Sequence, residues 1–380
     1  MKCFKNIQHY RIFVSIVLIV AGLLDNSASS YAQDCDPIKI VNAPGVYKGP
    51  GTGSVSGIAK TDLVRQQAIT QKFTKMVLDN YQPKGMNISY GAAHFSPAYY
   101  KPNGINTGNH YNANFFLKYF YCNHENKMEE IVETHSIIEF AVNGWKYPSS
   151  FFVRVDANEE DPETDVFGTI KNKPCWNNKG YWTMTDTVYS GRDITHFHYL
   201  VTKNRELPFV YMSKREFLEK LRVYYEKQIQ VTMNTWKNPT PDEAEYAKTR
   251  IEGDESFYGK SIQNIDDFLA NSSEEVLNEA ATVVGGGPPS EFEGFSESKY
   301  RNWVIKPNPD YYNPKAPSYT PHFIDVLFQI HEPEVACMNA KNDILKIIDF
   351  KALQEIVDKG GVQVANGTPA SKPASNAIKK

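Results

Sequence analysis

The spacing of apolar residues changes along this chain from a helical period to a strand period and back. Between 61 and 81, apolar side chains from Ile69 to Tyr81 recur at intervals of three and four, which predicts an amphipathic helix ended by the Pro83–Gly85 turn. From residue 111 the period becomes two. This pattern predicts strands at 111–122, 128–142, 151–155, 181–189 and 194–202, the first two joined by a hairpin turn at 123–126.

A second amphipathic helix follows these strands. Ser213 and Glu216 have the spacing of an N-terminal capping box, and an apolar stripe continues from Phe217 to Trp236. Strands joined by short turns favour antiparallel pairing, and helices on both sides of them in sequence favour layered packing. The predicted fold class for 33–238 is therefore α+β, an antiparallel sheet flanked by amphipathic helices.

The segment 239–361 has a different character and is predicted to be mostly helical and rich in loops. Short polar helices are expected at 242–251, 262–269 and 273–281, the last with a capping box at Ser272 and Glu275. An apolar run at 323–330 predicts a strand, and Asp349 is expected to cap a final helix that continues to Val357. The Ala-, Pro-, Ser- and Lys-rich segment 362–380 is predicted to be a disordered tail.

The first 32 residues have the pattern of a secretory signal peptide. Basic residues precede an apolar run from Ile12 to Leu24, and small residues at Ser30 and Ala32 suit cleavage after Ala32. The apolar run is too short to span a bilayer, so no membrane span is expected after signal cleavage. We therefore expect the mature protein to be exported, to the periplasm or beyond.

The net charge and the number of cysteines limit the classes of protein that this sequence fits. The formal net charge is −3, and the sequence has no cluster of Lys and Arg residues of the kind that binds nucleic acids. No nucleic-acid partner is therefore expected. Removal of the signal leaves four cysteines, Cys35, Cys122, Cys175 and Cys337. An even number in an exported protein predicts two disulfides, and three connectivities remain open.

Three segments carry a family resemblance. They are "NAPGVYK" after Cys35, the strand end "FYCN", and "LPFVYMSKREFLEKL" at 207–221. With them, 33–236 resembles a group of secreted bacterial proteins with no assigned function. The resemblance implies a turn, a cap and a helix face, and it supplies no catalytic residues.

The "HFH" at 196–198 is the main candidate for chemistry. On a strand, His196 and His198 share one face, while Phe197 and Tyr199 share the aromatic face that is expected to pack on the helices. Two such histidines can bind one metal if a third ligand is supplied by the polar row Glu133, His135 and Glu139 on another strand. The alternative, which we favour, is a solvated sheet face, where alanine at 196 or 198 would cost less than about 1 kcal/mol.

Other polar segments allow ligand binding with less specific patterns. The acidic loop 155–165 offers oxygen ligands for Ca²⁺ but lacks the turn glycine of an EF-hand, so a solvated loop is the alternative. The Tyr-rich loops 97–112 and 307–322 suit a glycan or peptide ligand, or else pack on their own domain, which we favour. No nucleophile motif and no cofactor fingerprint occurs, so no cofactor is predicted. The sequence predicts a non-enzymatic binding or envelope-associated protein, with a metal-dependent hydrolase using His135, His196 and His198 as the alternative.

Overall fold

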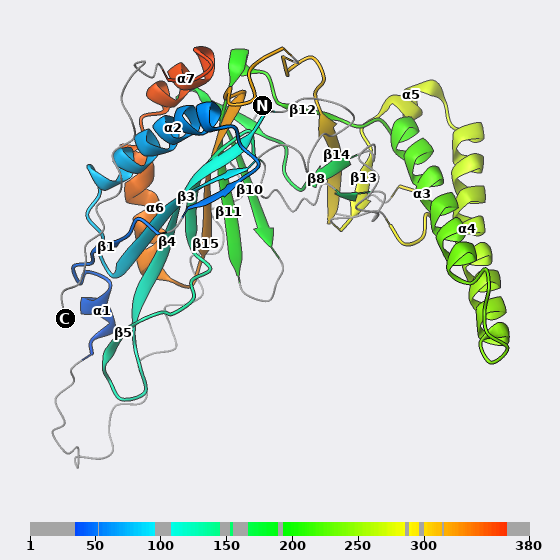
Figure 1. Ribbon diagram of the computed structural model, residues 1–380, viewed down its shortest axis with the longest axis horizontal. Helices are drawn as coiled ribbons and strands as arrows, with labels where there is room; N and C mark the ends of the chain where they lie inside the picture. The colour runs from blue at the N-terminus through cyan, green and yellow to red at the C-terminus, as the bar shows by residue number, and fades with distance from the viewer. Residues whose placement is uncertain are drawn as a thin grey trace, which may run out of the picture.

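The structure is a computed structural model in which two units lie side by side (Figure 1). It describes residues 35–51, 53–95, 108–144, 153–154, 166–188, 193–285, 289–295, 300–313 and 315–362. The predicted calcium loop 155–165, most of the Tyr-rich loop 97–112, the signal segment 1–32 and nearly all of the predicted tail lie outside these residues.

The larger unit contains a ten-stranded sheet with the order β1-β3-β4-β6-β15-β11-β10-β9, in which β2 also pairs with β3 and β5 with β4. The pairs β1–β3 and β2–β3 are parallel and the others are antiparallel. The strands are β1 (Tyr47–Lys48), β2 (Ser54–Ser56), β3 (Met86–Phe95), β4 (His110–Cys122), β5 (Met128–Glu130), β6 (Ile137–Val142), β9 (Cys175–Asn177), β10 (Tyr181–Val188), β11 (Ile194–Thr202) and β15 (Phe323–His331).

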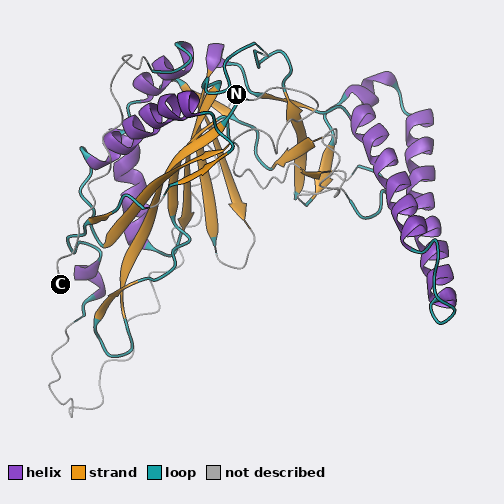
Figure 2. Ribbon diagram, viewed as in Figure 1, coloured by secondary structure: helices purple, strands orange, loops and turns teal. Residues whose placement is uncertain are grey.

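Helices cover one face of this sheet, as Figure 2 shows. Helices α2 (Lys60–Leu78), α6 (Val335–Ile347) and α7 (Phe350–Asp358) pack there, and the short α1 (Pro37–Ile40) lies near β4. Phe73 of α2, Ile344 of α6 and Leu353 of α7 meet Phe140 and Phe328 of the sheet in the main apolar core. The predicted α+β class is thus confirmed.

The smaller unit is formed by two segments of the chain, each of which connects two strands of the main sheet. Its sheet has the order β12-β14-β8-β7, with β13 also paired to β14. Strands β7 (Val153–Arg154) and β8 (Val166–Ile170) come from the segment between β6 and β9. The segment between β11 and β15 supplies β12 (Phe209–Tyr211), α3 (Lys214–Thr235), α4 (Ala244–Asn271), α5 (Glu274–Asn278), β13 (Thr282–Val284) and β14 (Arg301–Pro307).

The pairing of the strands divides the chain at other positions than the predicted domain boundary at residue 238. Strand β15 lies between β6 and β11 in the main sheet, and Phe323 pairs with Thr202 across more than a hundred residues of sequence. Residue 238 falls in the turn between α3 and α4, which pack on each other. The segment 203–307 is therefore an insertion between two neighbouring strands of the main sheet.

The two short helices expected at 242–251 and 262–269 are wrong, because one helix, α4, continues from Ala244 to Asn271. Two glycines inside it cost about 1 kcal/mol each relative to alanine. Packing against α3 offsets this cost: Ile265 is buried between the helices, and Tyr258 stacks on Tyr225 with ring centroids 5.5 Å apart. In the described part of the chain no helix is long and apolar enough to cross a membrane.

Other elements differ locally from the expectation. The strand expected at 128–142 is interrupted, and 131–136 is irregular between β5 and β6. The cap of α5 is Ser273 rather than Ser272. Helix α6 was not anticipated, although its buried Ala336, Cys337, Ala340 and Ile344 follow helical spacing.

Only part of the expected disulfide pairing is found in the structure. Cys35 and Cys122 form a disulfide. Cys337 is a free, buried thiol, so the prediction that all four cysteines are paired is wrong. Its side chain lies in the core between α6 and β4, where its Sγ is 4.0 Å from the carbonyl oxygen of Leu117.

Candidate functional site

The two histidines of the "HFH" lie on β11, one of the central strands of the main sheet. Phe197 and Tyr199 pack against the helix-side core, as predicted. His196 and His198 occupy the opposite face, but they are only 2% and 1% exposed. The prediction of a solvated face is therefore wrong. Strands β10 and β15 flank β11 on both sides, so these side chains lie within the protein rather than at an edge.

His198 forms a buried pair with Asp325 of β15. Its Nδ1 lies 2.8 Å from Asp325 Oδ2, and Asp325 is 2% exposed. Because a carboxylate only accepts hydrogen bonds, the Nδ1–H of His198 donates, and its Nε2 is left as an acceptor. Among the described residues, neither His198 Nε2 nor Asp325 Oδ1 has a hydrogen-bond partner. This arrangement orients an imidazole with one basic nitrogen directed away from the carboxylate.

A second buried polar pair lies on the same sheet face. Asn112 of β4 donates through its Nδ2 to Glu139 Oε1 of β6 over 2.5 Å, and Asn114 donates to Asn112 Oδ1 over 3.0 Å. Glu139 is 1% exposed. On four successive strands, Asn114 lies opposite Glu139, Glu139 opposite Leu327, and Leu327 opposite His198. Directly opposite residues point to the same side of a sheet, so both pairs share one face. We call the face formed by Asn112, Asn114, Glu139, His196, His198, Asp325 and Gln329 the polar face.

The remaining residues of the predicted metal set lie elsewhere. Glu133 and His135 are in the irregular segment 131–136, where Glu133 is exposed and His135 is half-buried. The carbonyl oxygen of His135 accepts a hydrogen bond from Gln329. Among the described residues, no three His, Cys, Asp or Glu side chains are grouped closely enough to hold a metal ion. Of the expected polar row, only Glu139 lies on the polar face.

Several buried polar atoms of the polar face and its borders have no hydrogen-bond partner in the described part of the chain. They are Asn114 Oδ1, Trp182 Nε1, His198 Nε2, Thr202 Oγ1 and Asp325 Oδ1. Trp182 and Asp325 both lie opposite Leu200, which places them on the His198 side of the sheet. Buried polar atoms in folded proteins are nearly all bonded, and each exception costs about 1–3 kcal/mol. Five such atoms lie close together in sequence register on one face of the sheet.

The Tyr-rich loop 307–322 packs inward at one end of the polar face. Tyr311 donates to the carbonyl of His322 over 2.7 Å and accepts from the amide of Lys203 over 3.0 Å. Tyr312 is 7% exposed and packs with Leu200 and Phe323. Burial raises the pKa of both tyrosines. These two rings therefore stabilise the loop, as the favoured interpretation of the sequence holds.

Sequence reasoning identified three members of the polar face, Glu139, His196 and His198, and missed the others. Asp325 and Gln329 interrupt the otherwise apolar run 323–330, and a charged residue in such a run is the signal that was available. Asn112 and Asn114 alternate with apolar residues on β4, which is the pattern of a strand with one polar face. No family model, curated protein or solved structure matches this chain.

Proposed function

We propose that this chain is an exported, non-enzymatic binding protein whose polar face holds a neutral, hydroxyl-rich ligand of the oligosaccharide class. The observation that carries the proposal is a set of five buried atoms on one sheet face that have no hydrogen-bond partner within the described part of the chain. Buried polar groups are normally satisfied by protein, water or ligand, and leaving them without a partner is costly.

The hydrogen-bond donors and acceptors among these atoms favour a ligand that carries hydroxyl groups. Asn114 Oδ1, His198 Nε2 and Asp325 Oδ1 accept hydrogen bonds, Trp182 Nε1 donates, and the Thr202 hydroxyl does either. A ligand that satisfies them presents several donors together with acceptors, as sugar hydroxyls do. The carboxylates of Glu139 and Asp325 disfavour an anionic ligand because like charges repel at low dielectric.

The spread of the atoms favours a ligand longer than one sugar ring. Asn114 lies on β4 and Trp182 on β10, four strand spacings apart in the sheet order. At about 4.8 Å per spacing, these side chains are roughly 19 Å apart across the sheet. The partly buried indole of Trp182 also offers an apolar surface of the kind that packs against sugar C–H groups.

Export is supported by the signal-like pattern of residues 1–32 and by the Cys35–Cys122 disulfide, since disulfides are kept mainly in oxidising compartments. We expect cleavage after Ala32, and the intact mass of the exported protein measures it. Retention of residues 1–32 in the mature protein would contradict this part of the proposal.

The binding experiment uses the mature protein and a panel of neutral trisaccharides, with melting temperature and calorimetry as readouts. At least one trisaccharide is expected to raise the melting temperature, as any ligand of the native state does. Asp325→Asn places an amide against His198, and Asn114→Ala removes one acceptor. Each should weaken binding about tenfold or more, since one lost partner costs about 1–3 kcal/mol.

The matched control is Asp343→Asn, which removes the same charge on the exposed surface of α6. It should bind like the wild type. Absence of any trisaccharide-induced shift, or equal binding by all variants, would contradict the proposal. A melting temperature that falls on addition of a chelator would instead favour the metal-dependent hydrolase.

A further inference from the structure

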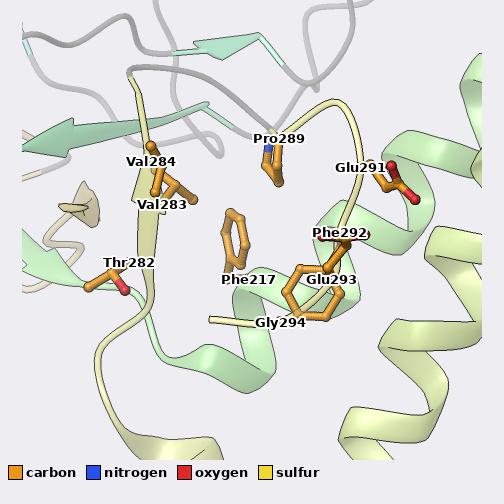
Figure 3. Close-up of a pocket in the computed structure, with 9 residues that line it drawn as sticks. All are labelled: Phe217, Thr282, Val283, Val284, Pro289, Glu291, Phe292, Glu293 and Gly294. Carbon is orange, nitrogen blue, oxygen red and sulfur yellow. The ribbon is translucent and has the colours of Figure 1, made fainter. Parts of the chain in front are cut away.

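Two of the pockets that the described residues form differ clearly in size. In the pocket of Figure 3, the ring of Phe217 lies between β13 and the 289–294 segment, and the volume is about 200 Å³. That volume is below the range of about 300–1,000 Å³ that is usual for small-molecule sites. A pocket of about 700 Å³, within this range, lies in the larger unit between α6, α7 and the turn that joins β9 to β10. We call it the α6–α7 pocket.

Apolar side chains form the floor of the α6–α7 pocket, and the main core holds them in place. Tyr181 and Ile348 are only 4% and 7% exposed and belong to that core. The ring of Phe350, the first residue of α7, packs on Tyr181 with ring centroids 4.0 Å apart. Leu345 of α6 is half-buried against the same core. A floor of closely packed core residues keeps its shape before a ligand binds, and it suits an apolar ligand body.

Charged side chains surround this floor, and the basic ones are in excess. Three lysines and one aspartate line the pocket. The aspartate is Asp349, whose carboxylate accepts a hydrogen bond from the amide of Ala352 over 3.0 Å and so caps α7. Among the lysines, Lys346 is bonded to Asp343 of the same helix over 2.8 Å. The one acidic group of the lining is therefore engaged in a helix cap, and one of the lysines is engaged in an ion pair.

The other two lysines, Lys179 and Lys351, are exposed and form no ion pair within the described part of the chain. Lys179 stands in the β9–β10 turn and Lys351 in the first turn of α7, so they approach the pocket from two different elements. Glu355, one helical turn after Lys351, is bonded to Lys359 over 2.9 Å. Two ammonium groups beside an apolar floor match a ligand that carries a negative group on an apolar body, because opposite charges attract and the apolar body leaves water.

We propose that the α6–α7 pocket binds a small organic acid with an apolar aryl or alkyl body. The body packs on Phe350 and Leu345, and the carboxylate of the ligand lies against the ammonium groups of Lys179 and Lys351. This site lies on the helix side of the main sheet, because Tyr181 packs in the helix-side core, whereas the polar face is on the opposite side. The two sites are therefore independent of each other.

Calorimetry on the exported protein with 4-phenylbutyrate and its neutral amide, 4-phenylbutanamide, tests this proposal. The two probes share an apolar body and differ in the charge of the terminal group. We expect the acid to bind at least about threefold more tightly than the amide, because one exposed ion pair changes an equilibrium by up to about fivefold and two lysines contribute. Raising the salt concentration to about 1 M should remove most of this difference, since the Debye length then falls to about 3 Å.

Two variants separate the charge of the pocket from its shape. Lys179→Gln should weaken binding of the acid about two- to fivefold and leave binding of the amide unchanged. Asn342→Trp, at an exposed lining position of α6, places a large ring in the pocket and should abolish binding of both probes. The matched controls are Lys72→Gln and Lys72→Trp on the exposed surface of α2, outside the pocket lining, and both should bind like the wild type. All three positions are exposed, so these changes are expected to leave folding intact.

Three results would overturn the proposal. The first is the absence of 4-phenylbutyrate binding at millimolar concentration, and the second is equal affinity of the acid and the amide at low salt. The third is wild-type binding of the acid by Asn342→Trp, which would place the acid elsewhere on the protein. Asp325→Asn changes the polar face and should leave binding of the acid unchanged, so failure of the oligosaccharide site and failure of the α6–α7 pocket are distinguishable.

Discussion

The buried His198–Asp325 pair allows a quantitative test of how the polar face is held together. We consider three variants: His198→Leu, Asp325→Leu and the double substitution. His198→Leu leaves the Asp325 carboxylate buried at 2% exposure without the imidazole that it pairs with. Removing one member of a buried pair typically costs about 3–5 kcal/mol, because the remaining charge is desolvated and uncompensated. The expected loss in the free energy of unfolding is therefore in that range.

Asp325→Leu is expected to cost less. It leaves a neutral imidazole with an unbonded Nδ1–H, and an unsatisfied neutral donor costs about 1–3 kcal/mol. The double variant should recover most of both losses. Leu327 lies opposite position 198, and Ala141 and Leu200 lie opposite position 325, so two leucines would meet apolar neighbours. Replacing both members of a buried pair by apolar residues is often neutral or stabilising.

Urea unfolding monitored by circular dichroism measures all four proteins of this cycle. The coupling energy between the two positions is expected to be at least about 3 kcal/mol, because the two single losses sum to about 4–8 kcal/mol and the double variant recovers most of them. A loss below 1 kcal/mol for His198→Leu would refute the reasoning and restore the solvated face that the sequence suggested. A double variant less stable than His198→Leu would show that the pair stabilises the sheet outright.

Three further changes test other parts of the structure. Ser213→Ala removes the acceptor for the amide of Glu216, 3.2 Å away, and should lower the unfolding free energy by about 1 kcal/mol; the exposed Ser290→Ala is the control, and equal stability of both would contradict the cap. Burial raises the pKa of the Cys337 thiol to about 12, so a thiol reagent followed by peptide mapping should label Cys337 only after unfolding. Labelling in the native protein at the unfolded rate would contradict its burial. Burial lowers the pKa of His94 from 6.5 to about 4, so the unfolded chain binds the proton first and stability present above pH 6.5 is lost as the pH falls towards 4. His94→Phe, which keeps an aromatic ring against Tyr111, should flatten this loss in urea titrations at several pH values; an unchanged pH dependence would show that other groups cause it.

Local interactions explain which elements the sequence alone could specify. Strand β11 matches the predicted range, because its alternation of residues has the period of a pleated strand. The caps of α3 and α7 also match, since Ser213 and Asp349 each bond an amide three residues away. These signals act within a few residues and do not depend on the rest of the fold.

Tertiary structure alone decided what those elements meet. The sequence places Phe197 and His198 on opposite faces, but the burial of His198 depends on β15, whose Asp325 is 127 residues away. Periodicity carries no information about strand order, so the insertion of 203–307 between two paired strands was not predictable. Helix α4 continues through two glycines because α3 packs along it, and that contact is absent from the local pattern.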